Sequence, residues 1–194
     1  MENYINHALF GWYPYFCLTV FLAGSIIRFD REQYTWKTGS SQLLRRRQLR
    51  IGSNLFHIGI LIIFLGHLGG LLTPIQVFDA LGIGHSFKQG LAIVVGGIAG
   101  LMCLVGIAML TIRRLGDPRI RANSTFGDTA ILLILFVQLL LGLATIFISL
   151  GHMDGHEMVK FMSWAQGVLT LQSDAWTHVQ NVHIIFKLHL VLGM

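Results

Sequence analysis

Charged residues are scarce in this chain. Only 12% of its 194 residues are Asp, Glu, Lys or Arg, whereas about a quarter of the residues of a soluble domain are charged. Hydrophobic residues make up 54% of the sequence. A chain with so little charge cannot cover an apolar core in water, so the composition predicts an integral membrane protein.

Cysteine is scarce as well. The two cysteines, Cys17 and Cys103, both fall inside apolar runs, which excludes a disulfide framework. The first apolar run also lacks the basic start and small-residue cleavage site of a signal peptide, so we expect it to be retained as a membrane span.

The apolar runs predict an all-α fold. We expect one transmembrane domain over residues 1–194, a bundle of five transmembrane helices at 13–27, 51–72, 88–112, 128–150 and 181–194. The run at 181–194 would rise only about 21 Å, against a hydrocarbon core of about 30 Å, so we expect the fifth span to be truncated at the C-terminus. Apolar residues at helical spacing in 158–171 predict an amphipathic helix lying in the membrane interface.

The basic residues are concentrated in two segments between apolar runs. Seven Lys or Arg lie in 28–50 and four in 113–121. The formal charge of +5 could suggest a nucleic-acid partner, but this placement is better explained by membrane topology, and we expect no nucleic acid. The positive-inside rule puts both basic segments in the cytoplasm and the N-terminus outside.

Three of the nine histidines lie inside apolar runs. They are His57, His67 and His189, and ionisable groups at membrane depth usually face a protein interior, a cavity or a cofactor. With the topology above, His67 and His189 lie at matched depth near the outer side, as bis-imidazole ligation of one haem requires. His57 lies nearer the cytoplasm and would hold a second haem, with its partner ligand beyond Met194. A proton relay or structural hydrogen bonds remain open alternatives, whereas zinc is disfavoured because it wants four convergent ligands with Cys or carboxylate help.

Glycines and arginines near these histidines allow two readings each. Glycines surround the histidines of the second run, and they either let a flat macrocycle approach the backbone or serve helix packing; they are Gly59, Gly66, Gly69 and Gly70. Arg113 and Arg114 at the inner end of the third run could pair with haem propionates, or could be topology charges.

Ten short motifs, in order along the chain, resemble one known family. They are Y-P-Y at 13–15, Q-Y-T-W-K at 33–37, S-S-Q-L-L at 40–44, S-N-L-F-H-I-G at 53–59, G-H at 66–67, L-T-P at 72–74, P-R-I-R-A at 118–122, H-M-D-G at 152–155, W-A-Q at 164–166 and L-H-L-V-L-G-M at 188–194. With these motifs the sequence resembles the gamma subunit, a cytochrome b, of the respiratory membrane-bound nitrate reductase. The likeness covers essentially the whole chain.

This resemblance implies a multi-pass haem b anchor in the bacterial cytoplasmic (inner) membrane, with the N-terminus in the periplasm. Such a subunit oxidises membrane quinol near the outer face and relays electrons through two b-type haems. The electrons then reach an iron–sulfur beta subunit and a molybdenum alpha subunit, where nitrate is reduced. The chain would thus be a quinol-oxidising electron-transfer subunit and not the nitrate-reducing one.

The resemblance also implies roles for individual residues. His67 and His189 would hold the outer haem, and His57 the inner haem together with a ligand beyond Met194. Lys88, at the start of the third run, would help to bind quinol; without the resemblance, it would be read as a lysine that extends to the membrane interface. Arg114 is the candidate for a propionate contact.

Two other functions stay open from the residues. One is a haem b anchor for a different cytoplasmic iron–sulfur oxidoreductase, with the same fold and haem ligands but another terminal acceptor. The other is a haem-free membrane protein that uses its histidines as a proton relay.

Overall fold

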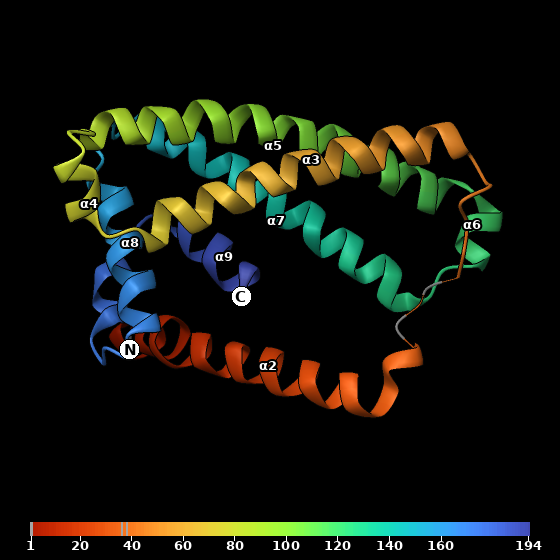
Figure 1. Cartoon of the computed structure of the whole chain (residues 1–194), viewed down its shortest axis with the longest axis horizontal. Coiled ribbons are helices and arrows are strands. Elements are labelled where there is room, and N and C mark those ends of the chain that lie inside the picture. Colours follow the sequence, from red (N-terminus) through yellow and green to blue (C-terminus); the bar gives the residue numbers. More distant parts are fainter. Residues whose placement is uncertain (1, 36, 38) are drawn as a thin grey trace. The chain divides into compact units, whose positions relative to one another are not determined.

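The computed structural model describes residues 2–35, 37 and 39–194, so Trp36 in the run at 33–37 lies outside the described part. The described part is helical and contains no β-strand. Four helical stretches are long and apolar enough to cross a membrane; they are Asn3–Thr35, Arg46–Leu72, His85–Gly116 and Phe126–Leu150 (Figure 1). The predicted helical membrane protein is confirmed for these four spans. In the fifth predicted span the structure has a shorter apolar helix, α9 (Ile184–Gly193), so a count of five spans is not confirmed.

The described residues fall into two compact units. The first takes in Met1–Lys37, His67–Gln89 and His152–Met194, and the second takes in Thr38–Gly66 and Gly90–Gly151. The elements of the first unit include α1 (Glu2–His7), the π-helix η1 (Ala8–Trp12), α2 (Tyr13–Glu32), η2 (Gln33–Thr35), α4 (Ile75–Ala80), α8 (His156–Leu169), η3 (Ala175–Val179) and α9. Two helices contribute residues to both units, α3 (Arg46–Leu72) and α5 (His85–Gly116), and the second unit also holds α6 (Pro118–Ala122) and α7 (Phe126–Leu150).

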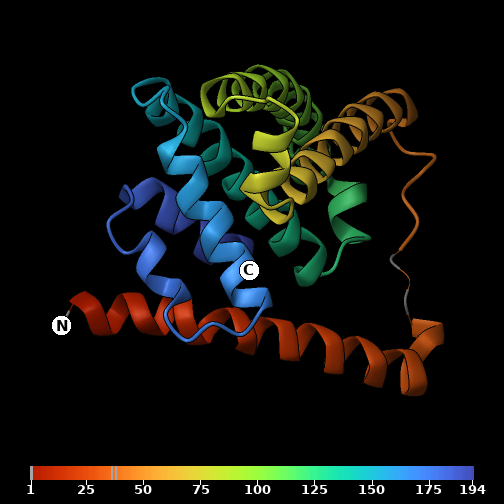
Figure 2. The ribbon, with the colours of Figure 1, turned by 60° about the vertical axis from the view of Figure 1, so that its left-hand side comes forward.

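Helix α8 is the centre of the first unit. Its Met162 and Val168 are buried, and the indole of Trp164 donates a hydrogen bond to the carbonyl of Phe10 at 2.9 Å. From the other side, the hydroxyl of Tyr15 donates to the carbonyl of Val168 at 3.0 Å, so α8 is fixed to the start of α2 (Figure 2). These long-range bonds satisfy polar groups that an apolar solvent could not satisfy.

The helix predicted at 158–171 is therefore present, but its bounds differ. It begins at His156 and ends at Leu169 because Leu171 adopts a left-handed conformation with φ of 61°, which a continuing α-helix cannot contain. Its place at the membrane interface stays a prediction.

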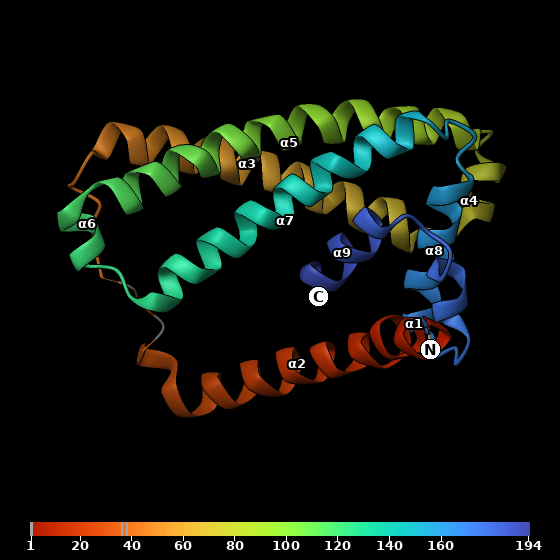
Figure 3. The same cartoon turned by 180° about the vertical axis from the view of Figure 1, so that it is seen from behind.

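In the second unit, α3 and α5 cross with almost no space between their backbones. A Cβ built on Gly106 would lie 2.5 Å from the backbone nitrogen of Phe56, and one on Gly59 would lie 2.6 Å from the Sγ of Cys103. On the other side of α5, Gly100 faces the side chain of Leu143 in α7 (Figure 3). Small residues at such crossings are typical of membrane helices, where dispersion contacts replace the hydrophobic effect as the driving force.

The turn between α5 and α6 is capped by Asp117. Its carboxylate accepts hydrogen bonds from the backbone amides of Arg119 at 3.0 Å and Ile120 at 3.4 Å, and Nε of Arg45 lies 2.9 Å away. Desolvation by itself would raise the pKa of Asp117, but the two amides and the Arg45 guanidinium outweigh it and hold the pKa below its usual value.

Replacing Gly106 or Gly59 by Ala should separate α3 from α5. The new methyl group meets backbone or a buried sulfur rather than a flexible side-chain end, so we expect a loss of about 1–3 kcal/mol of stability. The measurement is the thermal midpoint of the purified protein in detergent. Gly96→Ala, on the same α5 but with open space at its Cβ, is the matched control and should be neutral or stabilising. Equal melting of all three variants would contradict the close crossing.

Asp117→Ala should destabilise the α5–α6 turn in a pH-dependent way. Because the pKa of Asp117 is lower in the folded than in the unfolded protein, its ionised form stabilises the fold above the unfolded value of about 3.9. That contribution is lost as the pH falls through the lower folded pKa. We expect the melting difference from the unmodified protein to be larger at pH 7 than at pH 3, with the exposed Asp30→Ala as the control. A difference independent of pH would show that ionisation of Asp117 plays no part.

Candidate functional site

The first unit brings two of the predicted ligands together. The imidazole rings of His67 on α3 and His189 on α9 lie with their centroids 6.4 Å apart and their planes inclined by 46°. These two histidines come from the second and fifth apolar runs. We expected His67 and His189 to pair because of their matched depth, and in the folded chain their rings lie close together.

Helix α8 accounts for this juxtaposition because it contacts both elements that carry the histidines. The side-chain amide of Gln166 donates to the carbonyl of Leu71 at 2.9 Å, one turn beyond His67 at the end of α3. On the other side, the ring of Phe161 stacks on that of Phe186 in α9, with the centroids 4.9 Å apart. One short helix therefore sets the positions of both imidazoles.

The separation of the two rings leaves room for both imidazoles to hold one metal centre. In the described part of the chain no three His, Cys, Asp or Glu side chains converge as a metal-ion site. Two nitrogen ligands are sufficient where a macrocycle supplies the other four, as haem does. The donor set therefore fits a haem.

The glycines around His57 and His67 divide into two groups. The Cβ position of Gly59 is filled by the neighbouring helix, so this glycine serves helix packing. By contrast, no described atom lies within 4 Å of a Cβ built on Gly66, Gly69 or Gly70. The glycines that flank His67 thus leave room beside the helix, whereas the one near His57 does not.

His57, in the second unit, has its ring orientation fixed locally. Its Nδ1 lies 2.7 Å from the carbonyl oxygen of Ser53 and 3.2 Å from the Ser53 hydroxyl. A carbonyl can only accept, so Nδ1 carries the proton and the lone pair is left on Nε2. Metal-ligating histidines commonly have this arrangement, in which the second nitrogen donates to a backbone carbonyl. Sequence reasoning did not single out Ser53, although a residue four positions earlier on a helix is the natural partner.

Lys88 is turned into the first unit rather than toward solvent. Its side chain is buried, and Nζ donates to the carbonyl of Gly70 at 3.0 Å and lies 2.9 Å from the Sδ of Met162. The ammonium also lies 3.8 Å from the centre of the Phe78 ring. All of these partners are neutral. A buried cation held only by neutral groups is suited to bind a polar ligand oxygen, and its bond to Gly70 places it near His67 on α3. Gly70, Met162 and Phe78 carry no sequence pattern that would have marked them as neighbours of Lys88.

The two arginines at the end of α5 have different surroundings in the second unit. Arg113 is buried, and its guanidinium donates to the carbonyls of Ser41 at 2.6 Å and Leu44 at 2.8 Å, which gives it a structural role. Arg114 is more open; Nη1 lies 3.8 Å from the carboxylate of Asp128 and 3.3 Å from the hydroxyl of Ser124. A propionate contact by Arg114 stays a prediction.

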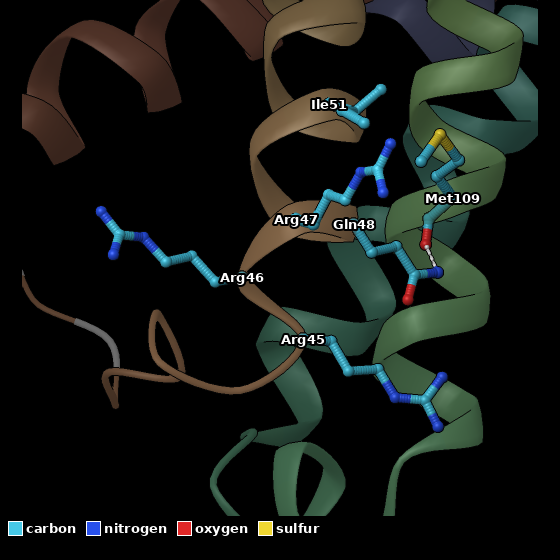
Figure 4. Close-up of a pocket in the computed structure, with 6 residues that line it drawn as sticks. All are labelled: Arg45, Arg46, Arg47, Gln48, Ile51 and Met109. Carbon is cyan, nitrogen blue, oxygen red and sulfur yellow. Dashed lines mark hydrogen bonds between the residues drawn. The ribbon is translucent and has the colours of Figure 1, made fainter.

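A shallow hollow of about 570 Å³ in the second unit lies beside the start of α3 (Figure 4). It is lined by Arg45, Arg46, Arg47, Gln48, Ile51 and Met109. None of the predicted site residues lines it. The Gln48 amide donates to the carbonyl of Met109 at 3.0 Å, and Figure 4 shows the Arg46 side chain directed away from these two residues. This basic surface coincides with the segment expected in the cytoplasm.

Comparison with known proteins gives consistent matches over the whole chain. The family described as "Nitrate reductase gamma subunit" matches residues 6–194. The respiratory nitrate reductase 1 gamma chain of Escherichia coli (strain K12) is 48% identical over 99% of this chain and 85% of its own length. The respiratory nitrate reductase 2 gamma chain of the same strain is 48% identical over 100% of this chain and 85% of its own length. The nitrate reductase gamma chain of Bacillus subtilis (strain 168) is 36% identical over 95% of this chain and 82% of its own length.

Proposed function

Because the chain belongs to the nitrate reductase gamma subunit family, we propose that it is the haem b anchor that oxidises quinol for a membrane-bound nitrate reductase. The observation that carries this proposal is the pair of imidazoles, His67 and His189, whose ring centroids are 6.4 Å apart. As a gamma subunit it works with other subunits, which we propose to be an iron–sulfur beta subunit and a molybdenum alpha subunit that reduces nitrate. The membrane is proposed to be the bacterial inner membrane, with the N-terminus in the periplasm.

Each proposed ligand has a defined task. His67 and His189 would hold an outer b-type haem, and His57 would be a ligand of an inner one. Bound haem would supply a centre that accepts and gives up single electrons. The Ser53 carbonyl keeps His57 in the tautomer whose Nε2 lone pair can bind a metal. Arg114 is the proposed partner of a haem propionate.

Lys88 is the proposed quinol-binding residue. Its ammonium, held by neutral partners, would donate a hydrogen bond to a ring oxygen of the quinol. The buried setting strengthens such a bond because the surroundings screen charge less than water does. Loss of protons at the outer face, together with inward movement of electrons, makes the reaction charge-separating.

Replacing His67 or His189 by Ala should remove one haem from the complete gene product assembled with its partner subunits. The measurement is the dithionite-reduced minus oxidised spectrum, with haem counted per chain. We expect two b-type haems in the unmodified protein, one in each variant, and loss of quinol oxidation. His178→Ala, an exposed histidine on η3, is the control and should keep two. Two haems in either His67 or His189 variant would show that the pairing is wrong, and no haem in the unmodified complex would favour the proton-relay alternative.

Lys88→Ala should weaken inhibitors of the quinol site roughly 10- to 100-fold, because a hydrogen bond to a charged group contributes about 1.5–3 kcal/mol. Both haem spectra should be unchanged. Lys160→Ala is the matched control, since Lys160 is partly exposed and pairs with Glu157 at 2.5 Å. Inhibitor affinity would be measured by fluorescence quenching or by titration of activity. An unchanged inhibitor affinity in Lys88→Ala would show that Lys88 does not bind quinol and has only a structural role.

A further inference from the structure

Oxidation of a quinol releases protons as well as electrons, and Lys88 is poorly suited to receive them. A charged ammonium has three donor hydrogens and no acceptor lone pair. Its partners are the carbonyl of Gly70, the thioether of Met162 and the ring of Phe78, and none of these is a base at neutral pH. The group that binds the quinol oxygen therefore needs a separate proton acceptor close by.

The nearest candidate on the same helix face is His85. It lies three residues before Lys88 in α5, a spacing that puts their Cβ atoms roughly 5–6 Å apart. Histidine is the side chain whose charge changes most readily around neutral pH. The ring nitrogen Nε2 of His85 lies 3.1 Å from Oδ1 of Asp79 in α4. Asp79 directly follows Phe78, the residue under the Lys88 ammonium, so one turn of α4 touches both members of the pair.

The contact with Asp79 determines which nitrogen of His85 is available. A carboxylate accepts, so Nε2 of the neutral imidazole carries the hydrogen and the lone pair remains on Nδ1. Nδ1 is therefore the nitrogen that can accept a proton, while the hydrogen bond to Asp79 orients the ring. This is the base-and-orienter arrangement that general base catalysis uses.

The surroundings of His85 hold it in place while leaving it a route to water. Gly155, with φ of 80°, packs so closely on the His85 backbone that a Cβ there would lie 2.7 Å from the His85 Cβ. The side chains of His85 and Asp79 are 36% and 55% exposed, respectively. A proton received by His85 can therefore leave to solvent.

Other titratable groups lie on the elements packed against His85. Those carried by α4, by the first turn of α5 and by the segment 151–155 are Asp79, Lys88, His152 and Asp154. The Asp154 carboxylate accepts from the backbone amide of His156 at 3.1 Å, and the His152 carbonyl accepts from Gln89 at 2.5 Å. Among the described residues, Asp79 is the carboxylate in contact with the imidazole.

We propose that His85, oriented by Asp79, is the proton acceptor for a quinol bound at Lys88 and passes the proton to outer water. The inference rests on the proposed function. The reaction takes two rounds. In each round one quinol O–H bond breaks and its proton forms an N–H bond on Nδ1 of His85. One electron would pass in each round to a one-electron acceptor, the proposed b-type haem. The imidazolium then gives its proton to water and is restored. After two rounds the quinol has lost two protons and two electrons and has become quinone.

The test compares His85→Gln and Asp79→Asn with the unmodified complex in the complete three-subunit enzyme. The rate of haem reduction by a soluble quinol analogue is followed by stopped flow from pH 5.5 to 9. We expect His85→Gln to be at least 10-fold slower near pH 7, with part of the rate restored by added imidazole or at high pH. Asp79→Asn should be slowed less, with its pH profile displaced. His178→Gln is the matched control and should behave as the unmodified complex.

Two further measurements separate this proposal from the function it rests on. The haem spectrum and the affinity of a quinol-site inhibitor should be unchanged in both variants. A rate within about twofold of the unmodified complex at every pH would overturn the assignment of His85. A slow variant that also lost inhibitor affinity and was not rescued by imidazole would overturn it too, since His85 would then shape the binding site. Absence of haem in the unmodified complex would instead contradict the proposed function, and the inference that rests on it would fail as well.

Discussion

The C-terminal end of α3 is the constraint on which the candidate site depends. The last four carbonyls of any α-helix lack partners within the helix, and in an apolar environment each unsatisfied carbonyl is costly. Here Lys88 donates to the carbonyl of Gly70, and Gln166 donates to those of Leu71 at 2.9 Å and Thr73 at 3.3 Å. The partial negative charge at this helix end also favours a cation. The same bonds that satisfy α3 thus hold the turn that follows His67, and they bring Lys88 and α8 to it.

Glycine has two opposite uses along α3 and α5. At Gly59 and Gly106 the missing Cβ lets two helices approach until the backbones are in contact. Beside His67, at Gly66 and Gly69, the missing Cβ leaves space that no described residue fills. The first use stabilises a helix crossing through dispersion contacts, whereas the second is suited to a flat group lying against the helix. Sequence alone cannot separate these uses because the residue type is the same.

Much of the fold followed from the sequence because a bilayer imposes strong rules. Runs of apolar residues predicted four helical spans, but the helices are longer than predicted. Helix α2 runs on from the expected end at 27 to Glu32, and α3 and α5 extend beyond 51–72 and 88–112 into basic or polar segments. The extension of α3 could not be read from hydropathy, since its first residues Arg46, Arg47 and Gln48 are polar yet helical. The predicted end of α8 was wrong for a different reason. Leu171 has a left-handed backbone conformation, which a hydrophobic pattern does not reveal.

The positions of the site residues could be predicted where they follow from depth in the membrane. They could not be predicted where they depend on tertiary contacts. His67 and His189 could be paired because both lie inside apolar runs at matched depth, and their rings do meet. The surroundings of Lys88 depend on Phe78 and Met162, which come from separate elements and look like ordinary apolar residues in the sequence. His85 has no distinguishing sequence pattern for the same reason: its contact with Asp79 arises only when the turn after α4 folds back.

The buried cations of this chain follow one physical rule. Lys88 and Arg113 are both almost fully buried, and both are held by backbone carbonyls rather than by carboxylates. A carbonyl satisfies the donors without cancelling the charge, so the residual positive charge stays available to an anionic or polar partner. The guanidinium of Arg113 donates to two carbonyls of the segment before α3, which gives Arg113 a structural role. Lys88 holds one carbonyl, one thioether and one aromatic face, all weak partners for an ammonium except the carbonyl. That difference in partner strength, rather than any difference in burial, is why we propose Lys88 and not Arg113 as the cation that binds a ligand oxygen.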